Sequence, residues 1–340
     1  MTIAPFRVWT DRRSAPPEIT ARARSDRDGK RRRDLSLLGR LTGTLAAALV
    51  GAVALAACGS SSSSDGKIKV VAAENEYGSV ASQIGGRYVT VQSVESNPNT
   101  DPHTYEVSPG VAQEVSGAQV LVRNGVGYDD YMSKIAAASP NSSRQVIDAQ
   151  HLLGLPDSTP NPHLWYSPRT MPKVAAAMAA DFAKLRPAHA AYFRANVAKF
   201  DDSLRPWLHA LAKFKAKYGG TPVATTEPVA DYMLQAAGTV NMTPFSFQAD
   251  IMNGSDPSAQ GVSGQDALFS SHRVKVFVYN QQVTDALTQG FITAAKKAGI
   301  PVVGVYETMP TPGYTYQTWM LAEVNALEKA VAGKVSTVKL

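Results

Sequence analysis

Residues 172–218 read PKVAAAMAADFAKLRPAHAAYFRANVAKFDDSLRPWLHALAKFKAKY, a stretch dominated by alanine, leucine and lysine. Apolar side chains recur along it at steps of three or four residues, which is the spacing of one face of a helix. Pro172 suits a first helical turn, and Pro187 and Pro206 mark later breaks. A helical pattern this long, with few caps, is typical of a segment that spans a structure. We therefore expect a long helical connector here.

Strand-like and helix-like segments alternate on both sides of this connector. Before it, strand patterns at 68–73, 88–91 and 119–122 alternate with helical patterns at 80–84 and 108–116. After it, strand patterns at 222–226, 274–279 and 301–305 alternate with helical patterns at 228–237, 284–298 and 316–332. Such a rhythm is typical of parallel sheets covered by helices. The sequence thus predicts an α/β fold with two lobes of mainly parallel sheet, joined by the connector.

The segment that precedes the first strand has the composition of an export signal. Lys30-Arg31-Arg32-Arg33 is positively charged, the run 41–57 is almost entirely small and apolar, and Cys58 follows Leu55-Ala56-Ala57. This pattern resembles a bacterial lipoprotein signal, in which the cysteine becomes the lipidated first residue. The run is too short and too rich in alanine for a comfortable transmembrane span. We expect a lipid on Cys58 to hold the chain at the extracellular face of the cytoplasmic membrane.

The formal net charge of +6 belongs to this leader. Residues 1–58 contain 11 basic and 5 acidic side chains, whereas the remainder contains 23 of each. A chain with no net basic charge has little to attract a phosphate backbone, so we expect no nucleic-acid partner. The single cysteine excludes an internal disulfide and a zinc cluster built from thiolates.

Polar groups that can bind a metal follow several of the predicted strands, where open α/β sheets bind ligands. Two histidines each follow a proline in a turn before a helix, His103 in Asp101-Pro102-His103 and His163 in Asn161-Pro162-His163. Glu227 comes directly after the strand that ends at Thr226, and Glu307 follows the strand at 301–305. Two imidazoles and two carboxylates are a suitable ligand set for a divalent first-row metal.

These motifs also carry a resemblance to a known family. Asp101-Pro102-His103, Val122-Arg123-Asn124-Gly125 and Asn161-Pro162-His163-Leu164-Trp165, followed by a long helix, resemble the metal-binding lipoproteins of bacterial zinc- and manganese-type ABC importers. The likeness extends over roughly 67–331, nearly all of the exported chain. It implies two α/β lobes joined by one rigid backbone helix, with the metal held in the cleft between them.

The resemblance also implies a role for each candidate residue. His103 and His163 match the two ligands of the first lobe closely, and Glu227 fits the third position. Glu307 is the only acid in the last loop and is the expected fourth ligand, with Asp250, Asp256 and Asp285 as rivals. Asn124 is expected either to support a ligand histidine or to be a plain turn residue. The remaining histidines are expected to be ordinary surface residues, and Asp129 to be solvated.

The implied function is capture of Zn²⁺ or Mn²⁺, with Fe²⁺ also compatible, for delivery to an ABC permease and its cytoplasmic ATPase. Glutamate at the third position and the lack of a histidine-rich loop resemble manganese-type members slightly more. We expect a monomer without enzymatic activity. The alternatives are a cell-envelope metallohydrolase, and an adhesin or a receptor for an organic solute.

The expected domains are a signal (1–58), a serine-rich tether (59–66), an N-terminal lobe (67–185), a linking helix (186–218) and a C-terminal lobe (219–340).

Overall fold

The computed structural model describes residues 66–104 and 107–340, which belong to one compact unit, Ser61–Leu340. The expected signal, Cys58 and nearly all of the expected tether lie outside the described residues. Within the described ranges, none of the helices combines the length and the apolar character that crossing a bilayer requires.

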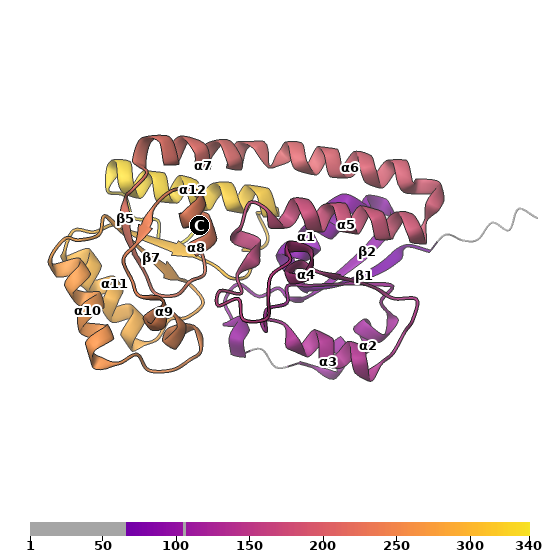
Figure 1. Cartoon of the computed structure of the whole chain (residues 1–340), viewed down its shortest axis with the longest axis horizontal. Helices are drawn as coiled ribbons and strands as arrows, with labels where there is room; N and C mark the ends of the chain where they lie inside the picture. The colour runs from indigo at the N-terminus through magenta and orange to yellow at the C-terminus, as the bar shows by residue number, and fades with distance from the viewer. Residues whose placement is uncertain (1–65, 105–106) are drawn as a thin grey trace, which may run out of the picture. The chain divides into compact units, whose positions relative to one another are not determined.

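The first lobe is built on a sheet of four parallel strands in the order β2-β1-β3-β4. Its strands are β1 (Ile68–Glu74), β2 (Val89–Glu95), β3 (Val120–Arg123) and β4 (Gln145–Asp148). Its helices are α1 (Asn75–Gly85), α2 (Pro109–Gly117), α3 (Asp130–Ala138), α4 (Ala149–Leu153) and α5 (Thr170–Leu185). In Figure 1, α1 and α5 lie above this sheet and α2 and α3 below it.

The second lobe repeats the same strand order, as β6-β5-β7-β8, again with every pair parallel. Its strands are β5 (Pro222–Thr225), β6 (Val240–Asn241), β7 (Val276–Asn280) and β8 (Val302–Val305). Its helices are α8 (Asp231–Ala236), α9 (Phe245–Met252), α10 (Ala259–Ser270), α11 (Ala286–Lys297) and α12 (Tyr316–Gly333). The two-lobed α/β architecture predicted from the sequence is confirmed.

Successive side chains of a strand point to opposite faces of the sheet, so alternate strand residues are buried in cores on the two faces. In β1, Val70 and Ala72 join one core with α1 and α5, whereas Val71 and Ala73 join another with α2 and α3. Parallel strands buried on both faces read as continuous apolar runs, which is why these strands could be recognised in the sequence.

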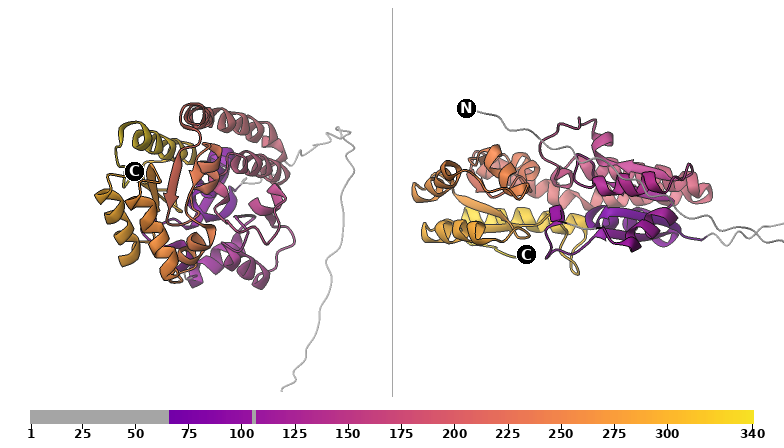
Figure 2. Two further views of the ribbon diagram at one scale, coloured as in Figure 1. Left: turned by 60° about the vertical axis from the view of Figure 1, so that its left-hand side comes forward. Right: turned by 90° about the horizontal axis from the view of Figure 1, so that it is seen from below.

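The connector consists of α6 (Ala190–Ser203) and α7 (Arg205–Tyr218), which run almost end to end along both lobes (Figures 1 and 2). Leu204 lies at the joint between them, and Pro206 stands in the first turn of α7. The α6 helix packs on α1 and α5, and α7 packs on α12. The apolar stripe of the connector is buried in a single core that includes residues of both sheets. The largest buried side chains of this stripe are Phe193, Phe200, Trp207 and Phe214.

Candidate metal centre

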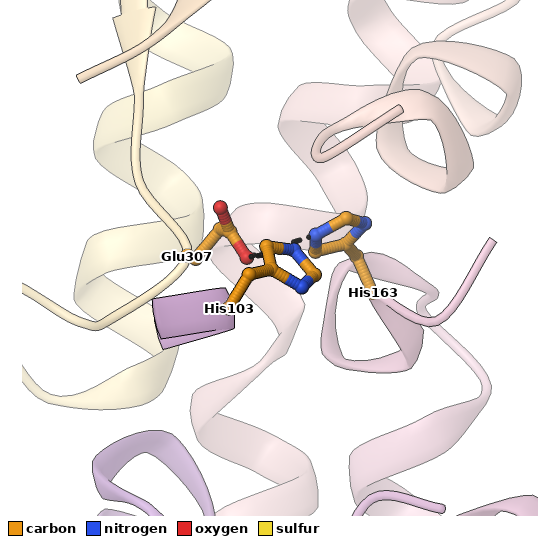
Figure 3. A group of neighbouring side chains, drawn as sticks. All are labelled: His103, His163 and Glu307. Atoms are coloured by element: carbon orange, nitrogen blue, oxygen red, sulfur yellow. Dashed lines mark hydrogen bonds and ion pairs between the residues drawn. The ribbon is translucent and has the colours of Figure 1, made fainter. Parts of the chain in front are cut away.

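Two imidazoles and one carboxylate meet where the two lobes face one another. The Nε2 atom of His103 and the Nε2 atom of His163 each lie 3.1 Å from Oε2 of Glu307 (Figure 3). One nitrogen or oxygen of each residue lies within 4.8 Å of the others, a spacing that could hold a metal ion. The side chains of His163 and Glu307 are fully buried, and that of His103 is 23% exposed.

Each member of this group follows from a local feature of the sequence. His103 lies in a short 3₁₀ helix, Pro102–Thr104, and its backbone N–H donates to Oδ1 of Asp101 at 2.9 Å. Glu307 follows β8, and its backbone N–H donates to Oε1 of Gln282 at 2.7 Å. The loop of His103 follows β2 and the loop of Glu307 follows β8. Both loops begin at the carboxyl ends of parallel strands, which is the edge at which α/β sheets bind ligands.

Asn161 fixes the orientation of His163. Its Oδ1 accepts a hydrogen bond from the backbone N–H of His163 at 3.0 Å and lies 2.8 Å from the ring atom Nδ1. Because a carbonyl oxygen can only accept, Nδ1 carries a proton, and Nε2 is left to face Glu307. The amide group of Asn161 donates in turn to the carbonyl of Pro228 at 2.8 Å, which ties this loop to the second lobe.

Aromatic rings surround the imidazoles. The hydroxyl of Tyr128 donates to Oε2 of Glu307 at 3.0 Å, so this hydroxyl and the Nε2 atoms of both histidines converge on that one oxygen. The ring of Tyr128 lies edge-on to His103, with centroids 5.2 Å apart, and Trp165 lies edge-on to His163 at 5.4 Å. These rings keep water away from the inner side of the group, which strengthens the interactions between its charged and polar atoms.

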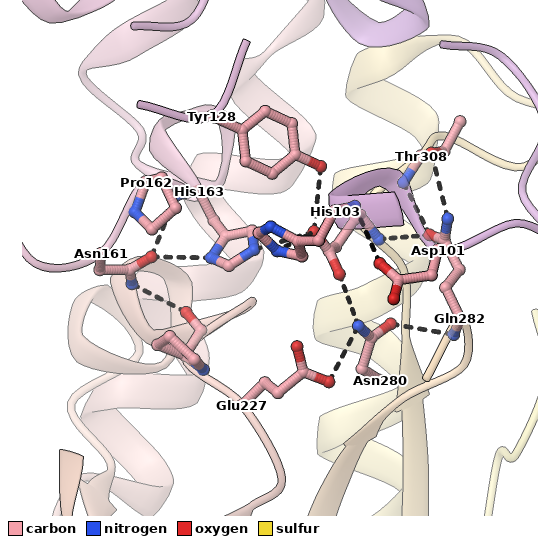
Figure 4. Close-up of polar contacts among 12 residues, drawn as sticks. Asp101, His103, Tyr128, Asn161, Pro162, His163, Glu227, Asn280, Gln282 and Thr308 are labelled. Atoms are coloured by element: carbon pink, nitrogen blue, oxygen red, sulfur yellow. Dashed lines mark hydrogen bonds and ion pairs between the residues drawn. The ribbon is translucent and has the colours of Figure 1, made fainter. Parts of the chain in front are cut away.

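Glu227 lies next to this group and is linked to it through Asn280. The Nδ2 atom of Asn280 donates to Oε1 of Glu227 at 3.1 Å and to Oε1 of Glu307 at 2.6 Å (Figure 4). The other oxygen of Glu227 is buried and has no hydrogen-bond partner. A buried carboxylate oxygen without a partner is costly, and a cation bound beside it would remove that cost.

The charges of these groups depend on one another. Burial lowers the pKa of His163. Burial also acts to lower the pKa of His103, but the carboxylate of Glu307 outweighs it and raises that pKa to about 9. For Glu307, burial is outweighed by the two histidines, which hold its pKa well below the usual range. Burial and the charge of Glu307 raise the pKa of Glu227. At neutral pH these directions describe a protonated His103 beside an ionised Glu307.

The four ligands proposed from the sequence thus lie together, although only three of them form the close group. In the described part of the chain Asn124 makes no hydrogen bond to an imidazole; its side-chain amide donates to the carbonyl of Pro162 at 2.7 Å, one residue before His163. Asp129 is buried rather than solvated, because its carboxylate accepts from the backbone N–H groups of Asn124 and Gly125. Sequence reasoning missed Asn280 and Tyr128, and it did not single out Asn161, although that residue stands inside the quoted histidine motif.

Comparison with known proteins identifies a matching family and several similar proteins. Residues 70–330 match the family described as zinc-uptake complex component A, periplasmic. The manganese-binding lipoprotein MntA of Bacillus subtilis (strain 168) is 29% identical over 172 residues, which are 48% of this chain and 56% of that protein. The chain thus spans about half the length of this curated relative.

Solved structures share the fold at low sequence identity. FpvC from Pseudomonas aeruginosa, solved in complex with Mn²⁺, aligns with a TM-score of 0.65 at 20% identity, covering 79% of this chain and 99% of its own. The laminin-binding adhesin Lmb from Streptococcus agalactiae, solved as a mutant, aligns with a TM-score of 0.65 at 16% identity, covering 78% and 99%. At these identities the likeness extends to the fold alone.

Proposed function

Because the chain belongs to the family of periplasmic components A of zinc-uptake complexes, we propose that it captures a divalent transition metal ion outside the cytoplasmic membrane and delivers it to an ABC permease. The family consists of solute-binding proteins of zinc- and manganese-type importers, which are transport receptors rather than enzymes. The ion is therefore cargo, and no chemical step is proposed.

The observation that carries this proposal is the convergence of donor atoms from both lobes. Nε2 of His103 and Nε2 of His163 come from the first lobe, and Oε2 of Glu307 comes from the second. Their 3.1 Å separations are close to the roughly 3.3 Å between two ligands that each lie about 2.0–2.1 Å from a tetrahedral ion. The buried free oxygen of Glu227 is the fourth donor in this proposal.

Ligand placement also suggests how binding is coupled to the arrangement of the lobes. An ion held by imidazoles of one lobe and carboxylates of the other stabilises the arrangement in which the lobes are close together. The size of that effect is limited by the difference between the ion's affinities for the closed and the open arrangement. For the ion to be released, the permease must then favour the open arrangement of the lobes, which binds the ion less well.

The remaining parts of the proposal concern the location and the assembly of the protein. We propose that Cys58 carries the lipid anchor, that the protein works as a monomer at the extracellular face of the membrane, and that the permease acts with a cytoplasmic ATPase. The single cysteine and the small-residue segment before it support the anchor.

The test is calorimetric titration of Zn²⁺ and Mn²⁺ into the metal-free protein and into a variant that carries both His103→Ala and His163→Ala. We expect the double variant to lose at least about 100-fold in affinity for both ions, because two of four ligands are gone. His209→Ala, which removes an exposed histidine of α7, is the matched control and should bind as the wild type does. Unchanged affinity in the double variant would overturn the proposal.

A further inference from the structure

Asn280, the last residue of β7, contacts both carboxylates of the candidate centre with one amide group. Its two N–H bonds are directed to Oε1 of Glu227, at 3.1 Å, and to Oε1 of Glu307, at 2.6 Å. A side-chain amide has only two such hydrogens, so its donor capacity is fully used. The side chain is 1% exposed, and water therefore does not compete for these bonds.

The orientation of this amide is fixed by its surroundings. Its Oδ1 accepts a hydrogen bond from the backbone N–H of Gln282 at 3.0 Å, and a backbone N–H can only donate. The opposite orientation of the amide would place an N–H group against that donor and an oxygen against two carboxylates. The backbone N–H of Asn280 is itself held by Oγ1 of Thr226 at 3.0 Å. The amide nitrogen must therefore face the two glutamates.

One oxygen of each carboxylate is consequently occupied by Asn280, which leaves one oxygen of each for a metal ion. For Glu307 the remaining atom is Oε2, the oxygen that both imidazoles approach. For Glu227 it is Oε2, which is buried and without a partner, on the side that faces the imidazoles (Figure 4). Bidentate binding by either carboxylate would require turning that carboxylate and weakening its buried hydrogen bond to Asn280.

We propose that Asn280 is a specificity-determining residue that restricts both glutamates to one oxygen each, and thereby favours four-coordinate Zn²⁺ over Mn²⁺. The inference rests on the proposed function of the same site. Zn²⁺ accepts two nitrogens and two oxygens in a tetrahedron, whereas Mn²⁺ prefers a larger, oxygen-rich shell. Two carboxylates held to one oxygen each supply four ligands with the histidines, and two freed carboxylates supply as many as six.

The test compares the affinities of wild type and Asn280→Ala for Zn²⁺ and Mn²⁺, measured by competition with a chromogenic chelator. We expect Asn280→Ala to lower the ratio of zinc affinity to manganese affinity by about tenfold or more, since groups that orient metal ligands typically contribute 10- to 100-fold. Asn280→Ser, whose side chain fills more of the space than alanine does, should also lower the ratio of zinc affinity to manganese affinity.

Asn241→Ala is the matched control. Asn241 has the same bonding pattern in the same lobe, since its Nδ2 donates to Thr225 and Asp231 and its Oδ1 accepts from the backbone N–H of Thr243. It contacts neither glutamate of the site. Its removal should destabilise the second lobe by a comparable amount and leave the zinc-to-manganese ratio within about threefold of wild type.

X-ray absorption spectroscopy of the zinc-loaded wild type tests the inference without any variant. We expect four nitrogen or oxygen neighbours in the wild type and five or more in Asn280→Ala. A wild-type shell of five or six neighbours, or a metal ratio that Asn280→Ala leaves unchanged, would overturn the role of Asn280 while leaving metal capture intact. A wild-type protein that binds neither ion would instead overturn the proposed function, and this inference with it.

Discussion

His163 illustrates how single residues prepare the candidate centre. Its imidazole is held at Nδ1 by Asn161, so its other nitrogen faces Glu307 in one tautomer and one orientation. The same residue carries no exposed surface, and burial favours the neutral ring that a metal requires. Preparing the ring in this way lowers the cost of binding, because neither the tautomer nor the rotamer has to change.

Removing Asn161 tests this preparation. We expect Asn161→Ala to weaken zinc affinity by about 10- to 100-fold, since the tautomer and the angle of His163 are no longer fixed. Asn124→Ala is the informative comparison. Asn124 supports the Pro162 carbonyl but touches no imidazole, so its loss should reduce stability more than affinity. Calorimetric zinc titration and thermal unfolding of both variants measure the two effects. An equal loss of affinity in both would mean that Asn124 supports the histidine as strongly as Asn161.

At the scale of elements, the α12 helix is joined to the histidine loop by a buried carboxylate. Oε1 of Glu323 accepts from Nε1 of Trp319 at 2.9 Å and lies 3.3 Å from the hydroxyl oxygen of Tyr166. The same hydroxyl donates to the carbonyl of Tyr306, the residue before Glu307. Tyr166 thus links the loop of His163, the loop of Glu307 and α12. The other oxygen of Glu323 is buried without a partner.

Glu323 gives the unfolding free energy a defined dependence on pH. Burial raises its pKa from an ordinary value of 4.5 to about 8. The folded state therefore binds this proton more tightly than the unfolded state, so Glu323 does not reduce the free energy of unfolding below about pH 4.5. The reduction grows as pH rises toward 8 and reaches on the order of 4–5 kcal/mol. The folded chain is thus penalised at alkaline pH by a buried carboxylate that must ionise although one of its oxygens has no hydrogen-bond partner.

Replacing this carboxyl group with an amide should remove that dependence. We expect Glu323→Gln to gain stability relative to wild type as pH rises from 5 to 9, because an amide does not ionise. Urea unfolding of both proteins at several pH values measures the difference, in which the other titrating groups cancel. Glu114→Gln, which makes the same exchange at an exposed carboxyl group of α2, serves as the control. A constant difference between wild type and Glu323→Gln across this range would contradict the expectation.

The elements that could be predicted from the sequence are those whose burial produces a local pattern of apolar residues. β1 and β3 are apolar on both faces, and α6 and α7 carry a buried stripe, so their spacing identified them. β4 was missed because only Ile147 of its four residues is buried. The candidate ligands could be singled out because they follow strands or prolines. Asn280 gave no signal, because a polar residue at a strand end acquires its role only from Glu227 and Glu307, which lie 53 and 27 residues away.

At the scale of the whole described unit, the two lobes share one core and several direct hydrogen bonds. The core that contains Val70 of the first sheet continues through Trp207 to Val303 of the second. Near the candidate centre, the side chain of Asn75 exchanges two hydrogen bonds with the backbone of Met309, at 2.9 and 3.0 Å. A shared core argues for cooperative unfolding and for small relative movements of the lobes.

Metal binding should therefore stabilise the unit as a whole. Free zinc at about 100 times its dissociation constant adds about 2.7 kcal/mol, which corresponds to roughly 5–10 °C in the unfolding temperature. We expect this rise in differential scanning calorimetry as a shift of a single transition, and its loss when EDTA is added. The variant with His103→Ala and His163→Ala should show no rise. Separate transitions, with only one of them responding to zinc, would mean that the lobes unfold independently.

The last expectation concerns how the unit is held at the cell surface. Cys58 precedes the first described residue, Gly66, by eight positions, and the intervening sequence is rich in serine. If the lipid on Cys58 is the only anchor, Cys58→Ser should shift the protein from the membrane fraction to the soluble fraction, because a serine hydroxyl does not form the thioether that joins the lipid. The compact unit begins after this residue, so zinc affinity and unfolding temperature should not change. Cell fractionation with metabolic lipid labelling measures the first effect, and calorimetry measures the second. A Cys58→Ser protein that stays in the membrane fraction without label would mean that another segment of 1–65 holds the chain there.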